Sequence, residues 1–323
     1  MTEPVTRPDV AMFLGYLNGL PGPKMHEVGA VAARQTYAQM REMVDQPIGE
    51  LATITDLTIP GPAGAIPARL FDARASREPG PAMVFYHGGG FTIGDLDSHA
   101  SFCAEIARVL DIPVFAVDYR LAPEAPFPAA PDDAEAAARW IAGNPAELGR
   151  RVTGLVLCGD SAGGNLTIVV AIALRDAPAA VPVIAQLPIY PATDSSRDYP
   201  SYAAFSTGRL LTEESMTWFN DSYAADPHDL RASPLNADLT ALPPAVVMTA
   251  GLDPIRDQGR AYAAALAQAG VAVVFREATG NIHGFVTLRK AIPSAQGDVA
   301  GFLAAARTLI AESEAQRVMA QAA

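Results

Sequence analysis

Gly159-Asp160-Ser161-Ala162-Gly163 joins an apolar run, residues 152–158, to a second apolar segment that begins at Ser161. The first run predicts a buried strand and the second a helix. A serine on a sharp turn between a strand and a helix needs small neighbours, because the two backbones approach closely there. The turn raises the hydroxyl above the sheet edge, beside the N–H groups that begin the helix. The pattern therefore predicts a nucleophile at Ser161, although a glycine-rich turn without a catalytic role has the same spacing.

Strands and helices alternate on both sides of this turn. Strands are predicted over residues 51–59, 65–71, 82–86, 113–117, 152–158, 183–189, 245–250 and 271–275. Helices are predicted over residues 98–110, 131–141, from 161 onward, and over 213–223, 254–269 and 301–310. The first two strands alternate in polarity and share a short glycine-rich turn, which indicates an antiparallel pair. The later strands are continuously apolar and joined by helices, which predicts an α/β fold with a mostly parallel sheet covered on both faces.

Two segments stand outside this alternation. About the first 45 residues have a helical pattern, and the stretch from Asp194 to about Pro243 contains its own helix. Both are predicted to form one helical cap over the carboxyl edge of the sheet. The expected division is residues 1–48 for the N-terminal part of the cap, 49–193 for the catalytic core, 194–228 for the cap insertion and 229–323 for the rest of the core.

Composition excludes several classes of protein. The 323 residues include 23 Lys and Arg against 35 Asp and Glu, a net charge of −12 that repels nucleic acids and anionic lipid surfaces. Two cysteines, Cys103 and Cys158, cannot build a disulfide framework. Residues 1–4 lack the start of a signal peptide, and no apolar run approaches the roughly 20 residues that span a bilayer. A cytoplasmic protein without metal, cofactor, nucleic-acid or membrane partner is expected.

A glycine-rich loop precedes the serine turn by about 70 residues. His87-Gly88-Gly89-Gly90-Phe91 follows the strand at 82–86, and consecutive glycines allow N–H groups to converge on an anionic oxygen. Gly88 and Gly89 are predicted to donate to an oxyanion together with Ala162, and His87 to orient the loop. A phosphate-binding loop is the alternative, which the absence of a following Lys-Ser/Thr pair disfavours.

A serine nucleophile needs a general base that an acid holds in place. Of five histidines, His283 lies just beyond the last predicted strand, where a loop reaches the same sheet edge as Ser161. The acid is predicted from the loop after strand 245–250, where Asp253 is preferred to Asp257, which already lies in a helix. Asp194, at the end of another strand, is a third candidate. The order serine, aspartate, histidine is that of the α/β-hydrolases.

The sequence resembles the hormone-sensitive-lipase family of bacterial esterases (bacterial family IV), within the α/β-hydrolase superfamily. The resemblance covers the chain from about residue 50 and includes Asp118-Tyr119-Arg120-Leu121-Ala122-Pro123-Glu124 and Pro126-Phe127-Pro128. It implies a mixed, mostly parallel eight-stranded sheet with a helical cap, and carboxylester hydrolysis without a cofactor. It also implies the roles assigned above to the serine, histidine, aspartate and oxyanion donors. Two positions depart from the family: Gln258 stands where Glu is usual, and Asn281 where an apolar residue is frequent.

The expected activity is that of a serine carboxylesterase acting on short- to medium-chain esters through an acyl-enzyme. Phe13, Phe205, Trp218 and Ile282 are the candidates for the substrate pocket. A non-catalytic receptor with the same fold is the main alternative, and the presence of His283 disfavours it. Amide or thioester hydrolysis is a second alternative. The expected partner is a small ester, and a homodimer is left open.

Overall fold

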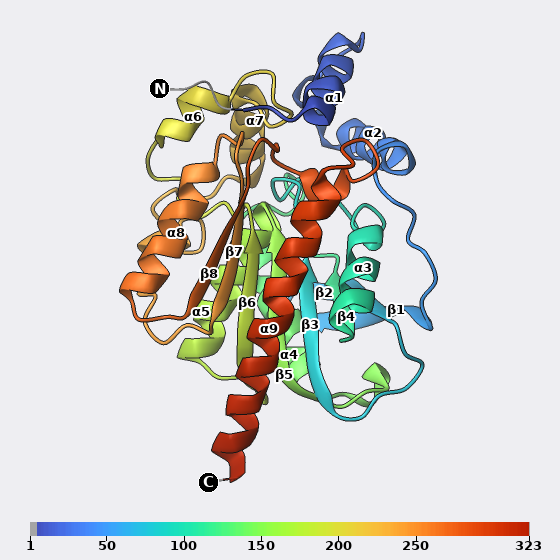
Figure 1. Cartoon of the computed structure of the whole chain (residues 1–323), viewed down its shortest axis with the longest axis vertical. Coiled ribbons are helices and arrows are strands. Elements are labelled where there is room, and N and C mark those ends of the chain that lie inside the picture. The colour runs from blue at the N-terminus through green and yellow to red at the C-terminus, as the bar shows by residue number, and fades with distance from the viewer. Residues whose placement is uncertain (1–4, 323) are drawn as a thin grey trace.

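The computed structural model describes residues 5–322 and contains an eight-stranded sheet at its centre (Figure 1). The strands are β1 (Thr53–Gly61), β2 (Gly64–Asp72), β3 (Gly80–Tyr86), β4 (Val114–Val117), β5 (Val152–Asp160), β6 (Val183–Ile189), β7 (Ala245–Ala250) and β8 (Val273–Ala278). Their order is β1-β2-β4-β3-β5-β6-β7-β8, with β2 antiparallel to both of its neighbours and the other pairs parallel. The prediction of a mixed, mostly parallel eight-stranded sheet is confirmed.

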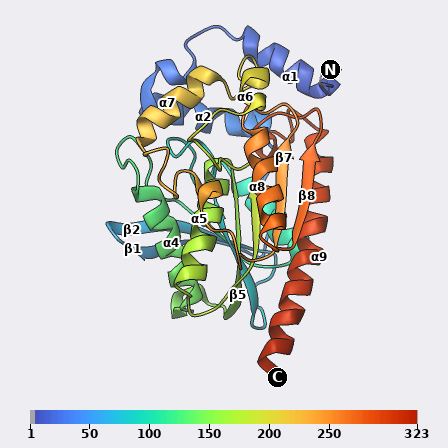
Figure 2. The ribbon, with the colours of Figure 1, turned by 90° about the vertical axis from the view of Figure 1, so that its left-hand side faces the viewer.

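Helices cover both faces of the sheet (Figure 2). The helices α3 (Ala100–Leu110) and α9 (Ala295–Ala322) pack on one face, and α4 (Ala129–Ala142), α5 (Ala162–Asp176) and α8 (Arg256–Gln268) on the other. Strand β5 shows why both faces are apolar: Val156 and Cys158 join the first core, whereas Leu155 and Leu157 join the second. Alternate residues of a strand point to opposite faces, so a strand buried on both sides must be apolar throughout.

Four helices lie together above the carboxyl ends of the strands, at the top of Figures 1 and 2. Two come from the N-terminus, α1 (Pro8–Gly19) and α2 (Gly29–Val44), with the short 3₁₀ helix η1 (Met25–Glu27) between them. The other two, α6 (Pro200–Phe205) and α7 (Glu213–Tyr223), belong to the segment between β6 and β7. These four helices are here called the cap. Its two parts come from the segments predicted to leave the alternation.

Arginine–aspartate contacts fix the N-terminal part of the cap at both of its ends. Arg7, before α1, donates to both carboxylate oxygens of Asp298 on α9, at 2.6 and 2.9 Å. Asp45, after α2, accepts from Nε and Nη2 of Arg289 at 2.9 and 3.0 Å. Arg289 is fully buried and also contacts Glu105 on α3. The helices α1 and α2 are thus tied to the core where they begin and where they end.

Replacing Arg289 by leucine is expected to lower the free energy of unfolding by about 3–5 kcal/mol, because the buried Asp45 would lose its ionic partner. Denaturant unfolding followed by circular dichroism measures the change. Lys290→Leu, at an exposed neighbouring position, is the control and should change stability by less than about 0.5 kcal/mol. A loss below about 1 kcal/mol for Arg289→Leu would show that the arginine does not tie the cap to the core.

Some element boundaries differ from the prediction. The last strand covers 273–278 instead of 271–275, and α9 begins at Ala295 instead of 301. The prediction relied on apolar residues, but β8 is the outermost strand and some of its positions are exposed. Arg276 is one of these positions, so the apolar pattern ended before the strand does. Helix α6 was not predicted, since six residues are too few to show a helical period. Residues 1–4, on which the expectation about a signal peptide rests, lie outside the described residues.

Candidate active site

Ser161 occupies a strained turn between β5 and α5. Its backbone angles are φ 55° and ψ −115°, a conformation that non-glycine residues rarely adopt. The glycines on either side make the turn possible. A Cβ atom on Gly159 would lie 2.3 Å from the carbonyl oxygen of Gly163, and one on Gly163 would lie 1.9 Å from that of Tyr86. The spacing of the two glycines is therefore a steric requirement of this turn.

The structure brings Ser161, His283 and Asp253 together in one hydrogen-bonded chain. Nε2 of His283 lies 2.8 Å from Oγ of Ser161, and Nδ1 lies 2.6 Å from Oδ2 of Asp253. Asp253 is fully buried, and its other oxygen accepts the backbone N–H of Ile255 at 2.9 Å. The three residues follow β5, β8 and β7, whose carboxyl ends meet at one edge of the sheet.

The two alternative carboxylates are occupied elsewhere. Asp257 accepts the backbone N–H of Ser201 on α6 at 3.0 Å and pairs with Arg256 at 2.8 Å. Burial raises the pKa of Asp257, but its arginine neighbours outweigh burial, and the pKa lies below its usual value. Asp194 is fully buried and accepts hydrogen bonds from residues that follow it in the chain, among them Ser196. Neither carboxylate contacts His283.

The loop of residues 87–91 is here called the oxyanion loop. Its geometry differs from the prediction in which glycines can donate to an oxyanion. The N–H of Gly88 donates to Oδ1 of Asp160 at 2.8 Å, and Gly88 is absent from the wall of the cavity above Ser161. Gly89, Gly90 and Ala162 do line that cavity, and their N–H groups have no hydrogen-bond partner among residues 5–322. Gly90 therefore replaces Gly88 among the candidate donors. The sequence alone could not show which two of the three glycines donate, because Asp160, which accepts the N–H of Gly88, lies 72 residues away.

His87 anchors the oxyanion loop and does not line the cavity above the serine. Its Nδ1 donates to the carbonyl oxygen of Gly88 at 2.8 Å, and its ring stacks on Tyr119 at 4.4 Å. Burial, with a smaller contribution from His99, lowers the pKa of His87 to about 4. The ring is neutral at pH 7, and a neutral histidine with its hydrogen on Nδ1 suits a structural role.

Comparison with known proteins agrees with this geometry. Residues 83–287 match the model of a family described by the α/β hydrolase fold. The chain belongs to the hormone-sensitive-lipase family of carboxylesterases. It is 45% identical to the carboxylic ester hydrolase LipN of Mycobacterium tuberculosis over 245 residues, which are 73% of this chain and 65% of LipN. It is 37% identical to the esterase LipI of the same organism, over 88% of this chain and 90% of LipI.

Solved structures show the same fold over almost the whole length. An α/β-hydrolase enzyme from the metagenome of Lake Arreo, Spain, superposes with a TM-score of 0.90 at 36% identity, over 95% of this chain and 98% of its own. An esterase of Pyrobaculum calidifontis superposes with a TM-score of 0.85 at 36% identity, over 94% of this chain and 99% of its own. The prediction that the protein is a carboxylic ester hydrolase of bacterial family IV is confirmed.

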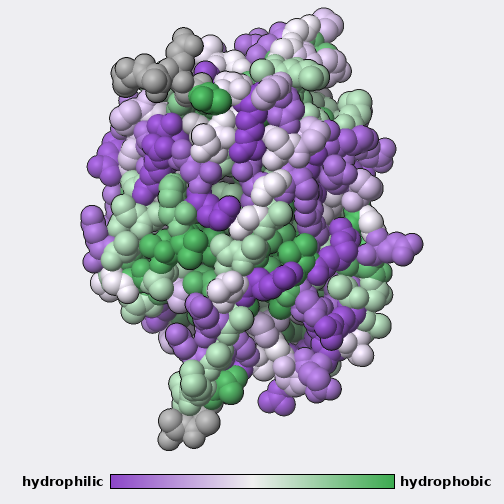
Figure 3. Space-filling view, in the orientation of Figure 1, coloured by the Kyte–Doolittle hydropathy of each residue, from purple (hydrophilic) through white to green (hydrophobic). Residues whose placement is uncertain are grey.

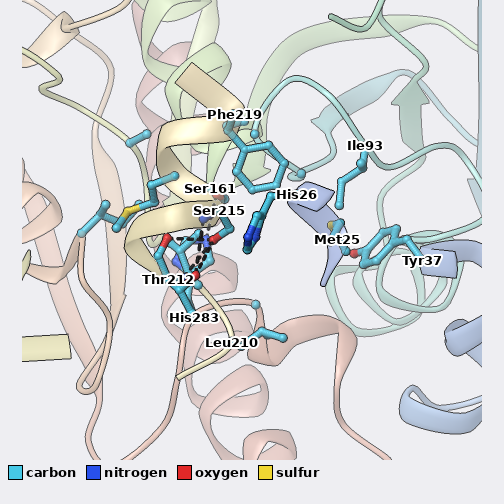
Figure 4. Close-up of a pocket in the computed structure, with 18 of the residues that line it drawn as sticks. Met25, His26, Tyr37, Ile93, Ser161, Leu210, Thr212, Ser215, Phe219 and His283 are labelled. Carbon is cyan, nitrogen blue, oxygen red and sulfur yellow. Dashed lines mark hydrogen bonds between the residues drawn. The ribbon is translucent and has the colours of Figure 1, made fainter. Parts of the chain in front are cut away.

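The serine of this carboxylesterase opens into a cavity of about 1460 Å³ that lies between the cap and the sheet edge (Figure 4). Met25 and Tyr37 approach from the N-terminal part of the cap, Phe219 from α7, and Ile93 from beyond the oxyanion loop. Phe219 lies directly over the oxyanion loop, because a Cβ atom on Gly90 would be 2.2 Å from its ring. The cap therefore builds much of the wall above Ser161, with apolar side chains and with polar ones such as His26, Thr212 and Ser215.

Only one of the four predicted pocket residues of the esterase lines this cavity. Phe13 does so, whereas Phe205, Trp218 and Ile282 do not. Ile282 is fully buried in the core on the α9 face, and Phe205 belongs to the same core. Trp218 neighbours Phe219 on α7, and successive residues of a helix point about 100° apart. Bulk alone could not identify which side of each element faces the substrate.

The two departures from the family pattern have local partners in this esterase. Oε1 of Gln258 accepts the backbone N–H groups of Thr193 and Asp194, at 2.9 and 3.2 Å, which anchors α8 without an ion pair. Nδ2 of Asn281 donates to Asp298 at 3.1 Å and ties the loop before His283 to α9.

Within residues 5–322, no group of three or more His, Cys, Asp and Glu side chains is arranged to hold a metal ion. None of the helices in that range is both long and apolar enough to cross a bilayer.

Replacing Gly89 by valine is expected to lower kcat by on the order of 100-fold, comparable to the loss of one oxyanion donor. Gly89 has φ +115°, and a Cβ atom there would lie 2.2 Å from the carbonyl oxygen of Ile93, so the oxyanion loop must shift. Steady-state kinetics with a p-nitrophenyl ester measures the loss. Gly64→Val is the control, because Gly64 also has a positive φ but open space around it. A folded Gly89→Val enzyme with near-normal kcat would exclude this loop from catalysis.

Proposed function

We propose that the enzyme hydrolyses carboxylic esters through an acyl-enzyme on Ser161, with His283 as general base and Asp253 as its partner. The observation that carries this proposal is the hydrogen-bonded chain from Ser161 through His283 to the buried Asp253. Nε2 takes the hydroxyl proton as Oγ attacks the ester carbonyl, and it returns that proton to the departing alcohol. A water molecule then repeats the sequence on the acyl-enzyme and releases the acid.

Backbone N–H groups stabilise the negative charge that develops on the carbonyl oxygen. In this proposal Gly89, Gly90 and Ala162 bind the oxyanion, since their N–H groups border the cavity and have no partner among the described residues. Ala162 begins α5, so the helix dipole adds to its effect. Donors held in place before the reaction stabilise the charge without reorganising, which is why such holes contribute strongly to catalysis.

Short- to medium-chain esters are the proposed substrates. Apolar side chains in the cavity, among them Met25 and Phe219, support this choice, and among the relatives is an ethyl acetate hydrolase of Pseudomonas putida, 36% identical over 89% of this chain and 94% of its own. Rates on p-nitrophenyl esters of increasing acyl length test the preference. We expect kcat/KM to peak between about two and eight carbons, and a peak at sixteen carbons would contradict the proposal.

Labelling with a fluorophosphonate tests the nucleophile. We expect one equivalent of label on Ser161, found by peptide mass spectrometry, and a stoichiometric burst of p-nitrophenol from an activated ester. Label on another serine would contradict the mechanism, and a receptor without catalysis would show no burst. Full activity after treatment with a metal chelator is also expected, because the proposed reaction draws only on groups of the chain itself.

A homodimer, which the sequence leaves open, is untested. Strand β8 ends the sheet and exposes Val274 and Phe275, and apolar residues gather at the level of β8 and α9 in the view of Figure 3. Sedimentation velocity of the purified protein distinguishes a monomer from a dimer.

A further inference from the structure

A second histidine–aspartate pair lies beneath the oxyanion loop, apart from the residues assigned to the reaction. Nε2 of His99 is 3.1 Å from Oδ1 of Asp160, and the two side chains are only 3% and 5% exposed. A carboxylate oxygen only accepts hydrogen bonds, so Nε2 carries a hydrogen and donates it. The mechanism proposed above uses neither side chain.

Asp160 contacts both the oxyanion loop and the surroundings of the base. Oδ1 accepts the N–H of Gly88 at 2.8 Å, and Oδ2 accepts the hydroxyl of Tyr190 at 3.3 Å. The ring of Tyr190 lies 4.6 Å from that of His283. A Cβ atom on Gly88 would be 2.5 Å from Oδ2 of Asp160, so the loop approaches the carboxylate as closely as glycine allows.

This contact sets the direction of the oxyanion loop. Because the N–H of Gly88 points down to Asp160, the following residues, Gly89 and Gly90, border the cavity. The other side of the loop is fixed by the carbonyl oxygen of Gly89, which accepts the N–H groups of Thr92 and Ile93 at 3.0 and 2.9 Å. A hydrogen bond to a carboxylate is roughly twice as strong as one between neutral groups. Asp160 is thus the strongest acceptor that holds the loop.

The surroundings keep Asp160 ionised and His99 oriented. Burial raises the pKa of Asp160, but the contacts with His99 and Gly88 outweigh it and hold the pKa below its usual value. Nδ1 of His99 lies 2.9 Å from Oγ of Ser98, and its ring packs 6.0 Å from that of Phe85. Without His99, Asp160 would be a buried charge that lacks its partner.

We infer that His99 and Asp160 are positioning residues, which hold the oxyanion loop in the orientation that binds the transition state. The inference rests on the proposed function, since an oxyanion forms only if Ser161 attacks the ester. Asp160 borders the cavity but is only 4% exposed, so the pair would act through the backbone of Gly88 and not by binding the substrate. It should therefore affect stabilisation of the transition state more than binding of the ester.

Two substitutions of His99 separate this role from a merely structural one. His99→Phe fills the space without a donor, whereas His99→Gln retains an N–H that can reach Asp160. The measurements are kcat and KM with p-nitrophenyl butyrate, and the inhibition constant of an alkyl trifluoromethyl ketone, which forms an oxyanion when serine adds to it. We expect His99→Phe to lower kcat and weaken inhibition by the same factor, about 10- to 100-fold, with KM within about threefold. His99→Gln should recover most of both losses.

His228→Gln, at an exposed histidine, is the control and should behave as wild type. A folded His99→Phe enzyme with unchanged kcat and unchanged inhibition overturns the inference, as does a change confined to KM. If His99→Phe does not fold, Asp160→Asn replaces it, because Asn keeps an acceptor for Gly88 but removes the charge. Equal losses of kcat and inhibition then support the inference, and no loss overturns it. Activity that survives Ser161→Ala would instead refute the proposed function, so the two failures are distinguishable.

Discussion

Ser161→Ala is expected to lower kcat for ester hydrolysis by about 10⁴-fold or more, because it removes the attacking oxygen and with it the acyl-enzyme route. KM should change little, since the cavity that surrounds the ester remains. The strained turn should persist, because the glycines that allow it are untouched. Steady-state kinetics measures the loss of kcat, and fluorophosphonate labelling of the same sample should show that the label on Ser161 is lost.

The control for this variant is Ser76→Ala, at an exposed serine in the loop between β2 and β3. It should label and turn over like the wild type. A Ser161→Ala enzyme that still becomes labelled and keeps more than about 1% of kcat would show that another residue attacks the ester.

Asp253→Asn is expected to lower kcat by on the order of 10⁴-fold at pH 7. Asp253 accepts the Nδ1 hydrogen of His283, which leaves Nε2 free to take the serine proton. An asparagine can present its NH₂ group to Nδ1 and so favour the tautomer with hydrogen on Nε2. The loss in serine proteases after the same substitution has this magnitude. The kinetics are to be measured beside Ser161→Ala with the same substrate.

Asp257→Asn is the matched control, because Asp257 lies four residues further on, in the first turn of α8. Its contacts are with Ser201 and Arg256, so we expect less than a tenfold change in kcat and a small loss of stability. The assignment of Asp253 would be wrong if Asp257→Asn abolished turnover while Asp253→Asn left it nearly intact.

The sequence predicted those parts of the molecule that depend on local pattern. The turn at Ser161 and the apolar strands follow from spacing and polarity along the chain, and the predicted sheet is the observed one. The loops after these strands bring Ser161, Asp253 and His283 together. The choice between Asp253 and Asp257 could also be argued locally, since one precedes a helix and the other lies in it.

Other parts of the site could not be predicted, because they depend on contacts between segments that are distant in the sequence. Gly88 was preferred to Gly90 because nothing near it in the sequence shows that Asp160 occupies its N–H. Ile282 and Phe205 were assigned to the pocket by size, although both face the core. Tyr37, which lines the cavity from α2, has no neighbour in sequence that points to the active site. Sequence pattern shows that a helix has an apolar face but not which surface that face covers.

The fixed ends of the N-terminal part of the cap determine how an ester reaches Ser161. Since Arg7 and Asp45 are tied to the core, α1 and α2 cannot swing outward as a unit without breaking two ion pairs, of which the Asp45–Arg289 pair is buried. The segment after α1 has no ion pair to the core among the described residues: residues 20–24 are exposed, and Gly22, at φ +112°, has open space around it. Leu20 and Pro23 of this segment also line the cavity. Entry and product release should therefore proceed by local displacement of these few residues, so that the rate of exchange is set by a short loop while the cap stays in place.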